Sequence, residues 1–267
     1  MKIAFIGGGN MGEAILAALL KKNLAIAKDI TVSDVADMRR QYIMQKYMVA
    51  VSAFNVEAIN GKDVVILAIK PQTLGNVMPE FKDHLKENQL VISIVAGARL
   101  NKLTEGLNHQ SIVRSMPNTP AQIGEGITMW TATPEVADQQ KETARIILGA
   151  IGKEFYASDE GWLDMATAVS GSGPAYLFYY IEAMTDAAVK IGLPRDTAKQ
   201  IVLGTVLGSA HLLAQSGKEP TELRKMVTSP GGTTAEAIQT FEKEDFSDIV
   251  AKAVKAAYEK SQKLGQG

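Results

Sequence analysis

The stretch that decides the fold stands at the start of the chain: Lys2-Ile3-Ala4-Phe5-Ile6-Gly7-Gly8-Gly9-Asn10-Met11-Gly12. Its apolar beginning is typical of a buried strand, and helical spacing of apolar residues follows in Ala14–Leu20. Glycines at positions 7, 9 and 12 fit the dinucleotide-binding fingerprint: one makes the tight turn, one lets a pyrophosphate approach the backbone, and one allows close helix–strand packing. The alternative is a glycine-rich strand–helix turn without a ligand.

The tip of the second strand bears on which dinucleotide is bound. Ile30–Ser33 is predicted to be this strand, and Asp34 follows it. A carboxylate at this place favours the ribose 2′-hydroxyl of NAD and repels the 2′-phosphate of NADP. Ser33 can donate to a phosphate, however, and Arg39 and Arg40 lie about one helical turn beyond, where we interpret them as a solvated helix face. The pattern therefore leaves both NADH and NADPH open.

Strand and helix patterns alternate through the rest of the first half, as in a doubly wound parallel sheet. Loops at Lys70-Pro71, Ala96-Gly97 and Met116–Pro120 follow predicted strands, at the carboxyl ends where such sheets bind ligands. The predicted strands after the second are Asp63–Ile69, Val91–Val95, Ser111–Ser115, Ile127–Trp130 and Glu154–Tyr156, with a helical run at Pro134–Leu148.

Strand patterns end near residue 158, and helical periodicity takes over. We therefore predict an α/β protein with a Rossmann domain at residues 1–158 and an all-α domain at residues 159–267. Gly204 and Gly208 stand one helical turn apart, a spacing that suits core packing or a subunit interface. The predicted helices are Leu177–Ile191, Thr197–Leu213, Glu222–Val227, Ala235–Phe241 and Ile249–Leu264.

The segment Ser229-Pro230-Gly231-Gly232-Thr233-Thr234 combines a turn with a helix start. Thr233 and Glu236 have the spacing of a capping box, which would leave the Thr234 hydroxyl available. Glycine amides next to a helix N-terminus present several N–H donors to a small anion such as a carboxylate or phosphate. An ordinary helix start without a ligand is the alternative.

A second predicted loop, Ala168–Tyr176, leads into the first long helix, with Pro174 suited to its first turn and Ser172 as a candidate cap. Upstream of it, Glu160 and Asp164 are one helical turn apart. By spacing alone, this pair is typical of an exposed acidic helix start.

Composition excludes several classes of protein. The 267 residues carry a net charge of −1, which gives no basic field for nucleic acid, and they contain no cysteine. We see no signal peptide and no apolar run of the roughly 20 residues that span a bilayer. The histidines, His84, His109 and His211, share no ligand spacing, so we expect no metal site. These features suit a cytoplasmic protein.

Taken together, the motifs make the chain resemble the pyrroline-5-carboxylate reductase family, the last enzyme of proline biosynthesis. The resemblance runs from Ile3 to about Leu264. The motifs that carry it, in the family's order, are Phe5–Gly12, Ala68–Pro71, Met116–Pro120, Ser170–Tyr176 and Ser229–Thr234.

The resemblance implies hydride transfer from NADPH or NADH to the imine carbon of 1-pyrroline-5-carboxylate, an oxidoreductase reaction that gives L-proline. It also implies a helical domain that interlocks with its copy in a homodimer, often assembled further to a decamer. The implied cofactor contacts, with the tip of the second strand included, are Ile6, Gly7, Gly8, Gly9, Asn10, Met11, Ser33, Asp34, Asn55, Ala68, Ile69, Lys70, Pro71, Val95 and Ala96. The implied substrate contacts are Glu160, Ser229, Gly231, Gly232, Thr233 and Thr234.

Thr234 is the candidate catalytic residue, whose hydroxyl would hydrogen-bond the imine nitrogen while the Gly231–Thr234 amides hold the carboxylate. One residue departs from the family: members that prefer NADPH often carry serine where this chain has Asp34. Two other hypotheses stay open, another imine or 2-keto acid reductase of the same plan and a non-catalytic protein that senses the cofactor. Cofactor preference, oligomer size, feedback by proline and the subunit that completes the site are left open by the sequence.

Overall fold

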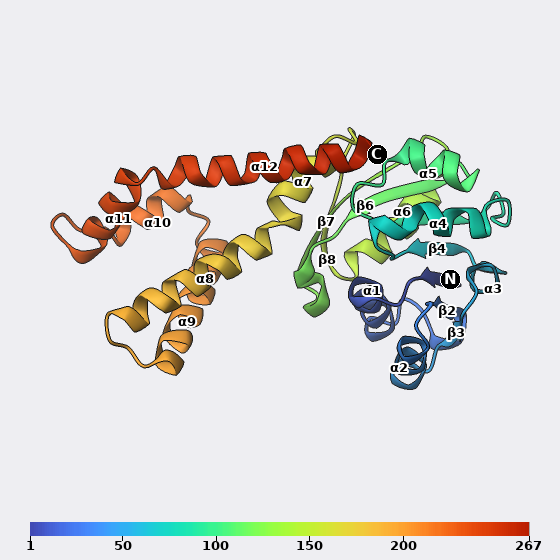
Figure 1. Ribbon diagram of the computed structural model, residues 1–267, viewed down its shortest axis with the longest axis horizontal. Coiled ribbons are helices and arrows are strands. Elements are labelled where there is room, and N and C mark those ends of the chain that lie inside the picture. Colours follow the sequence, from blue (N-terminus) through green and yellow to red (C-terminus); the bar gives the residue numbers. More distant parts are fainter. Residues whose placement is uncertain (267) are drawn as a thin grey trace. The chain divides into compact units, whose positions relative to one another are not determined.

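The computed structural model describes residues 1–266 and divides the chain into two compact units. The first unit contains Met1–Ser172 together with the end of the chain from Ala257, and the second contains Gly173–Ala256 (Figure 1). These limits differ from the predicted division between residues 158 and 159, which describes functional domains and stays a prediction.

The first unit is built on an eight-stranded sheet with the order β3-β2-β1-β4-β5-β6-β7-β8. All neighbouring strands are parallel except β6 and β7, which are antiparallel. The strands are β1 Ile3–Ile6, β2 Ile30–Ser33, β3 Ala50–Ser52, β4 Val64–Leu67, β5 Leu90–Ser93, β6 Ile112–Met116, β7 Gly126–Ala132 and β8 Gly152–Tyr156.

Helices cover both faces of the sheet, which explains why its central strands are apolar throughout (Figure 1). Ile3 and Phe5 of β1 belong to one core with helices α1, α2 and α6, whereas Ala4 and Ile6 belong to a second core with α3, α4 and α5. The helices of this part are α1 Asn10–Lys21, α2 Asp37–Tyr47, α3 Asn55–Ile59, α4 Pro71–Phe81, α5 Leu100–Leu107, α6 Asp138–Gly149 and α7 Trp162–Ala166.

Parallel pairing brings the ends of the predicted strands to one edge of the sheet. Ile6 pairs with Ser33 on one side and with Leu67 on the other, and Leu67 pairs with Ser93. The turns that follow these residues therefore lie together, as a doubly wound sheet requires.

Two features of the sheet were not predicted. β3 is a short edge strand with a partly polar surface, so its sequence lacks the apolar run of the central strands. β7 returns antiparallel to β6, because the connection between them holds only a short 3₁₀ turn at Thr119–Ile123 and no crossover helix.

The predicted loop Ala168–Tyr176 is wrong, whereas Pro174 lies in the first turn of α8 Gly173–Lys190, as predicted. Residues Thr167–Gly171 form a π-helical turn between α7 and α8, and the Ser172 amide donates to the Thr167 carbonyl at 2.8 Å. The serines and glycines here are small enough to continue a widened helical turn, and such turns frequently occur at functional sites.

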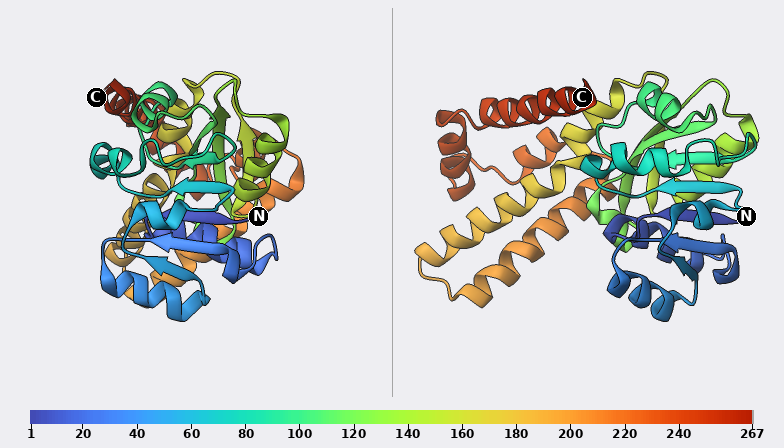
Figure 2. Two further views of the ribbon diagram at one scale, coloured as in Figure 1. Left: turned by 90° about the vertical axis from the view of Figure 1, so that its right-hand side faces the viewer. Right: turned by 45° about the vertical axis from the view of Figure 1, so that its right-hand side comes forward.

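The second unit is helical, and all five predicted helices are present within a few residues of their expected limits. Helices α8 and α9 form an antiparallel pair, joined by a turn in which Gly192 has a φ of +108° (Figure 2). The helices are α8 Gly173–Lys190, α9 Arg195–Ser216, α10 Pro220–Met226, α11 Thr233–Lys243 and α12 Phe246–Gln266, the last of which ends in the first unit. No helix within residues 1–266 has the length and apolar character that crossing a membrane requires.

Candidate active site

The turn between β1 and α1 has the geometry of a pyrophosphate cradle. Gly7 has a φ of +98°, and a Cβ at this position would lie 2.6 Å from the Ala68 carbonyl oxygen. A Cβ on Gly12 would lie 2.7 Å from the Gly7 carbonyl oxygen, so both glycines are required by the fold. Gly9 differs, because nothing lies within 4 Å of a Cβ built on it. The open side of Gly9, at the N-terminus of α1, is where a pyrophosphate fits.

Asp34 is fixed at the tip of β2. Its Oδ2 accepts a hydrogen bond of 2.9 Å from the Gly8 amide, and its Oδ1 accepts one of 2.9 Å from the Ala36 amide. The carboxylate is therefore tied to the glycine turn on one side and to the start of α2 on the other. This is the position from which an acidic residue contacts the adenosine ribose in dinucleotide-binding folds.

Ser33 and Asn55, also predicted to contact the cofactor, bond to each other. The Ser33 hydroxyl is buried and lies 2.5 Å from Asn55 Oδ1 and 3.3 Å from the Phe5 carbonyl oxygen. Asn55 Nδ2 donates in turn to Glu80 Oε2 at 2.6 Å. A bond from Ser33 to a 2′-phosphate would require this inward arrangement to break.

The interpretation of Arg39 as part of a solvated face is wrong. Its Nε donates to the Gly8 carbonyl, its Nη2 donates to Glu13, and its guanidinium lies 4.9 Å from the centre of the Tyr42 ring. Arg40 is also held, by bonds of 2.7 Å to the Asp34 carbonyl and 3.0 Å to the Val35 carbonyl. Helix periodicity does not reveal these contacts, since those of Arg39 depend on how α2 packs against the glycine turn and α1, and those of Arg40 depend on how the chain enters α2.

Glu13 collects an unusual number of donors. Its carboxylate accepts from Tyr47 at 2.7 Å, Lys46 at 2.9 Å and Tyr42 at 3.0 Å, as well as from Arg39. Burial of Glu13 raises its pKa, but the hydrogen bonds from Tyr47, Lys46, Arg39 and Tyr42 outweigh burial and lower the pKa to about 2. We refer to Glu13, Arg39, Tyr42, Lys46 and Tyr47 as the Glu13 cluster.

The turns after β4 and β5 complete this edge of the sheet. The Ala68 amide donates to the Ile6 carbonyl at 2.8 Å, which sets Ala68 beside Gly7, and Ile69 follows against the same glycine. Lys70 is the N-cap of α4 and Pro71 its first residue, so the predicted loop is here the start of a helix. Val95 is buried with its amide 3.3 Å from Ser93 Oγ, and Ala96 is partly exposed.

Glu160 and Asp164 are not the exposed helix start that their spacing suggests. Asp164 is 1% exposed and bonds at 2.9 Å to Arg99 and at 3.4 Å to Arg114, which is itself 3% exposed. Glu160 Oε1 accepts from Arg114 at 2.7 Å and from the Leu100 amide at 2.8 Å. A buried carboxylate, Asp164, and a partly buried one, Glu160, are paired here with two arginines, which sequence reasoning missed. The clue was an arginine inside the apolar strand β6.

The predicted anion loop lies in the second unit. Gly231 has a φ of +70°, and the Gly232 amide donates to the Ser229 carbonyl at 3.0 Å. The predicted capping box is wrong: Gly232 occupies the N-cap position, no side chain caps the helix, and Thr233 is the first residue of α11. Both threonines therefore lie in the first helical turn, where backbone N–H groups have no acceptor within the helix.

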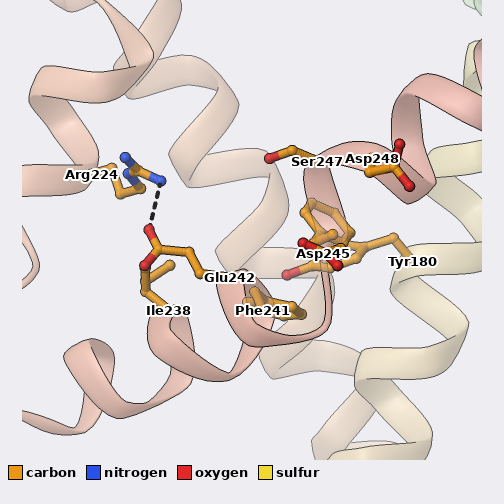
Figure 3. A pocket seen from close by; sticks show the side chains of 9 residues that line it. Tyr180, Arg224, Ile238, Phe241, Glu242, Asp245, Ser247 and Asp248 are labelled. Carbon is orange, nitrogen blue, oxygen red and sulfur yellow. Dashed lines mark ion pairs between the residues drawn. The ribbon is translucent and has the colours of Figure 1, made fainter.

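A cavity of about 510 Å³ lies among α8, α10, α11 and α12 in the second unit (Figure 3). Phe241 and Phe246 lie with their ring centres 5.2 Å apart and their ring planes tilted by 47°, and Arg224 pairs with Glu242 at 3.9 Å. Acidic side chains also line it, at Asp245 and Asp248.

The structure places the three histidines in different environments. His109 is buried, and one ring nitrogen lies 2.8 Å from the Gln89 carbonyl oxygen, while burial lowers its pKa. His84 and His211 are exposed. In the part of the chain that the structure describes, no three of its histidine, aspartate or glutamate residues are grouped as metal ligands would be.

Comparisons with known proteins agree over the whole chain. The family profile described as pyrroline-5-carboxylate reductase dimerisation matches residues 160–264, and the profile described as NADP oxidoreductase, coenzyme F420-dependent, matches residues 2–97. The pyrroline-5-carboxylate reductase of Synechocystis sp. is 41% identical over 266 residues, which cover 100% of this chain and 99% of that protein. The corresponding protein of Pseudomonas aeruginosa is 40% identical, over 99% of this chain and 97% of its own.

A solved structure of a pyrroline-5-carboxylate reductase from Coxiella burnetii matches with a TM-score of 0.90 and 36% identity, and the match covers 98% of each chain. The pyrroline carboxylate reductase of Plasmodium falciparum, solved with NADP bound, matches with a TM-score of 0.90 and 32% identity over 99% of this chain and 98% of that one. Sequence identity at this level over full length shows common membership, and the chain belongs to the pyrroline-5-carboxylate reductase family.

Proposed function

We propose that this chain reduces 1-pyrroline-5-carboxylate to L-proline with NADPH or NADH, the final step of proline biosynthesis, in the cytoplasm. The observation that carries the proposal is the full-length identity to curated pyrroline-5-carboxylate reductases. The glycine turn supports the proposal of a dinucleotide cofactor. The space beside Gly9 is open for a pyrophosphate, whereas protein atoms occupy the space beside Gly7 and Gly12.

The chain's first task is to hold the dinucleotide. The amides of Gly9, Asn10 and Met11 receive the pyrophosphate at the open side of Gly9, while the Gly8 amide holds Asp34, which receives the adenosine ribose. The residues from Ala68 to Pro71 and the pair Val95 and Ala96 border the nicotinamide half. When bound, the reduced nicotinamide supplies a hydride.

The second task is to hold the substrate, a five-membered cyclic imine that carries a carboxylate. The amides of Gly231, Thr233 and Thr234, at the start of α11, receive the carboxylate, while the Gly232 amide closes the turn on the Ser229 carbonyl. The Thr234 hydroxyl donates to the imine nitrogen and orients the ring. Reduction adds a hydride to the carbon of the C=N bond and a proton to its nitrogen, and the proton comes from water through the Thr234 hydroxyl.

Glu160 has a different part in this proposal. Its Oε1 already accepts hydrogen bonds from Arg114 and from the Leu100 amide. We therefore assign the contact with substrate to the other carboxylate oxygen, Oε2. The Arg114 pair fixes the orientation of Glu160, as outer partners fix residues that bind a ligand directly.

Self-association belongs to the same proposal. Few side chains of the second unit are buried, namely Thr185, Ala198 and Val202, and Leu203 and Leu207 of α9 are each 50% exposed. A Cβ on Gly204 or Gly208 meets nothing within 4 Å. Exposed apolar surfaces of this kind mark interaction sites, where a partner buries them. The dimerisation profile that matches residues 160–264 supports a second copy of the chain as this partner. We therefore propose a homodimer formed by the helical domain, residues 159–267, with further assembly to a decamer.

Turnover tests the reaction directly. The absorbance of the reduced nicotinamide is followed with racemic pyrroline-5-carboxylate, with NADH and NADPH in parallel and a panel of 2-keto acids as the comparison. We expect cofactor oxidation with the cyclic imine and appearance of proline. Oxidation with a keto acid and none with the imine would instead support another reductase of this plan.

A further inference from the structure

The residues around Gly8 determine which adenosine ribose this cofactor site accepts. Gly8 is buried, and both of its backbone polar groups are bonded to side chains. Its N–H donates to Asp34 Oδ2 at 2.9 Å, and its carbonyl accepts from Arg39 Nε. One carboxylate and one guanidinium are therefore held on the same residue, next to the predicted ribose position.

Asp34 makes this position unfavourable for a phosphate. Its two oxygens accept backbone hydrogen bonds, which stabilise the charged carboxylate. A 2′-phosphate carries a charge of about −1.5 to −2, comparable to that of other phosphate monoesters. Like charges brought together at a binding site weaken binding. A ribose diol, in contrast, can donate hydrogen bonds to the same carboxylate.

The cations that would offset this repulsion are engaged elsewhere. Arg39 bonds to the Gly8 carbonyl and to Glu13, and it packs over the Tyr42 ring. Arg40 bonds to the carbonyls of Asp34 and Val35 and to the Asp37 carboxylate. Both side chains are shielded, with exposed fractions of 25% and 17%.

Glu13 is the group that keeps Arg39 in place. It faces the guanidinium from α1, and the other members of the Glu13 cluster hold its carboxylate by donating to Oε1 while Arg39 bonds to Oε2. Lys46 is bound to the same carboxylate, so it is not available to a phosphate either. Arg39 and Lys46 of α2 are therefore both paired with Glu13 of α1.

We propose that Glu13 is a specificity-determining residue: it holds Arg39 on the glycine turn, leaves Asp34 alone to contact the adenosine ribose, and so makes the chain prefer NADH to NADPH. The inference rests on the proposed function only in the use of a nicotinamide cofactor. Asp34, after β2, was already expected to influence the choice between NADH and NADPH. The inference adds Glu13, on α1, as a second residue with this influence.

The test uses fragments that lack nicotinamide, so that it does not depend on imine reduction. Dissociation constants of ADP-ribose and 2′-phospho-ADP-ribose are measured by isothermal titration calorimetry on the full chain. We expect ADP-ribose to bind at least about tenfold more tightly, since like-charge repulsion acts only on the phosphorylated probe. Equal binding, or tighter binding of the phosphorylated probe, would overturn the proposal.

Variants then separate the two carboxylates. Asp34→Ser should reduce the discrimination, and Asp34→Ser with Glu13→Gln should reverse it, because Arg39 is then free to meet the phosphate. Adding Arg39→Met to the double variant should abolish the gain. If the double variant binds the phosphorylated probe no better than Asp34→Ser alone, Glu13 has no such role.

Tyr47→Phe is the matched control, since it removes one donor to Glu13 and leaves the bond between Arg39 and Glu13 in place. It should keep the wild-type ratio of the two dissociation constants. If Glu13→Gln lowers the Tm below the assay temperature, Glu13→Asp replaces it, because the shorter side chain draws the carboxylate away from Arg39. The expected ratios together with an absence of imine turnover would leave this inference standing and remove the proposed function.

Discussion

The Asp164 carboxylate accepts a hydrogen bond of 2.9 Å from the hydroxyl of Ser261, which lies 97 residues later in the sequence. The bond joins α7 to the last helix within the first unit, and both side chains are buried. Leu264 and Gly265 continue this contact, because a Cβ on Gly97 would lie 3.1 Å from Leu264 Cβ and one on Gly265 would lie 2.7 Å from Arg99 Nε. The end of the chain thus packs on the turn after β5, which we expect to border the nicotinamide.

Loss of the Asp164 charge should therefore destabilise the first unit. Asp164→Ala leaves the buried Arg114 and the neighbouring Arg99 without this partner, and breaking a buried ion pair costs about 3–5 kcal/mol. Urea unfolding should show this loss, with Asp138→Ala as the control because Asp138 forms only an exposed pair with Lys141 at 3.6 Å. Equal unfolding midpoints for the two variants would contradict the role of the cluster.

Gly9→Ala should separate folding from cofactor binding. Gly9 has a φ of −63°, and its Cβ position is open, so alanine is compatible with the fold. The added methyl group would stand where the pyrophosphate approaches. We expect an unchanged Tm and weaker NADH binding, by about tenfold or more if a single contact is lost, as measured by fluorescence titration.

Gly7→Ala is the contrasting variant. Its φ of +98° disfavours a side chain, and the added Cβ would lie 2.6 Å from the Ala68 carbonyl oxygen. This variant should lose stability as well as cofactor affinity. A normal Tm for Gly7→Ala, or an unfolded Gly9→Ala, would show that the turn differs from the one described.

Thr234→Ala should slow the reaction without affecting the fold. Removal of a hydrogen bond to a charged partner costs about 1.5–3 kcal/mol, so kcat/KM should fall by about tenfold to a hundredfold. Thr240→Ala is the matched control on the same helix, since its hydroxyl donates only to the Glu236 carbonyl, at 3.0 Å. Steady-state kinetics on both variants decide the matter, and an unchanged value for Thr234→Ala would rule out the assigned role.

Glu13 should make stability depend on pH in the acid range. Its pKa falls from 4.5 to about 2 on folding, so the folded state binds this proton less readily than the unfolded chain. The stabilisation is present above pH 4.5 and is lost as the pH falls toward about 2. Urea midpoints measured across this range should fall less steeply for Glu13→Gln than for the wild type. Parallel curves would mean that the folded and unfolded pKa values of Glu13 are the same.

The exposed face of α9 gives a prediction about assembly. Leu207→Glu places a charge on a side chain that is 50% exposed in the single chain, so the isolated chain should tolerate it. If a second copy covers this face, burial of the charge should dissociate the dimer. Light scattering should then report the mass of one chain for the variant and a multiple of it for the wild type, with a decamer as the expected upper size. Lys218→Glu, outside the helices, is the control.

Much of the fold follows from local patterns. The strand β1, the glycine turn and the start of α1 are predictable because a parallel strand buried on both faces must be apolar and because Gly7 and Gly12 have no substitutes. The five helices after residue 172 are predictable for a similar reason, since they show helical periodicity and most of their ends lie next to proline or glycine. The edge strand β3 was missed, and β7 was predicted as a strand but not as an antiparallel one, because pairing depends on neighbouring strands and not on a strand's own sequence.

The charged contacts divide in the same way. The sequence by itself determined the cofactor turn, the family and the residue types available to the site, since these depend on spacing along the chain. Only the tertiary structure decided that Arg39 bonds to Gly8 and Glu13, that Arg114 pairs with Glu160 and Asp164, and that Gly232 takes the cap position expected of Thr233. The first two contacts depend on which side chains are brought together by packing. The third depends on where the backbone enters the helix. Local periodicity in the sequence predicts none of the three.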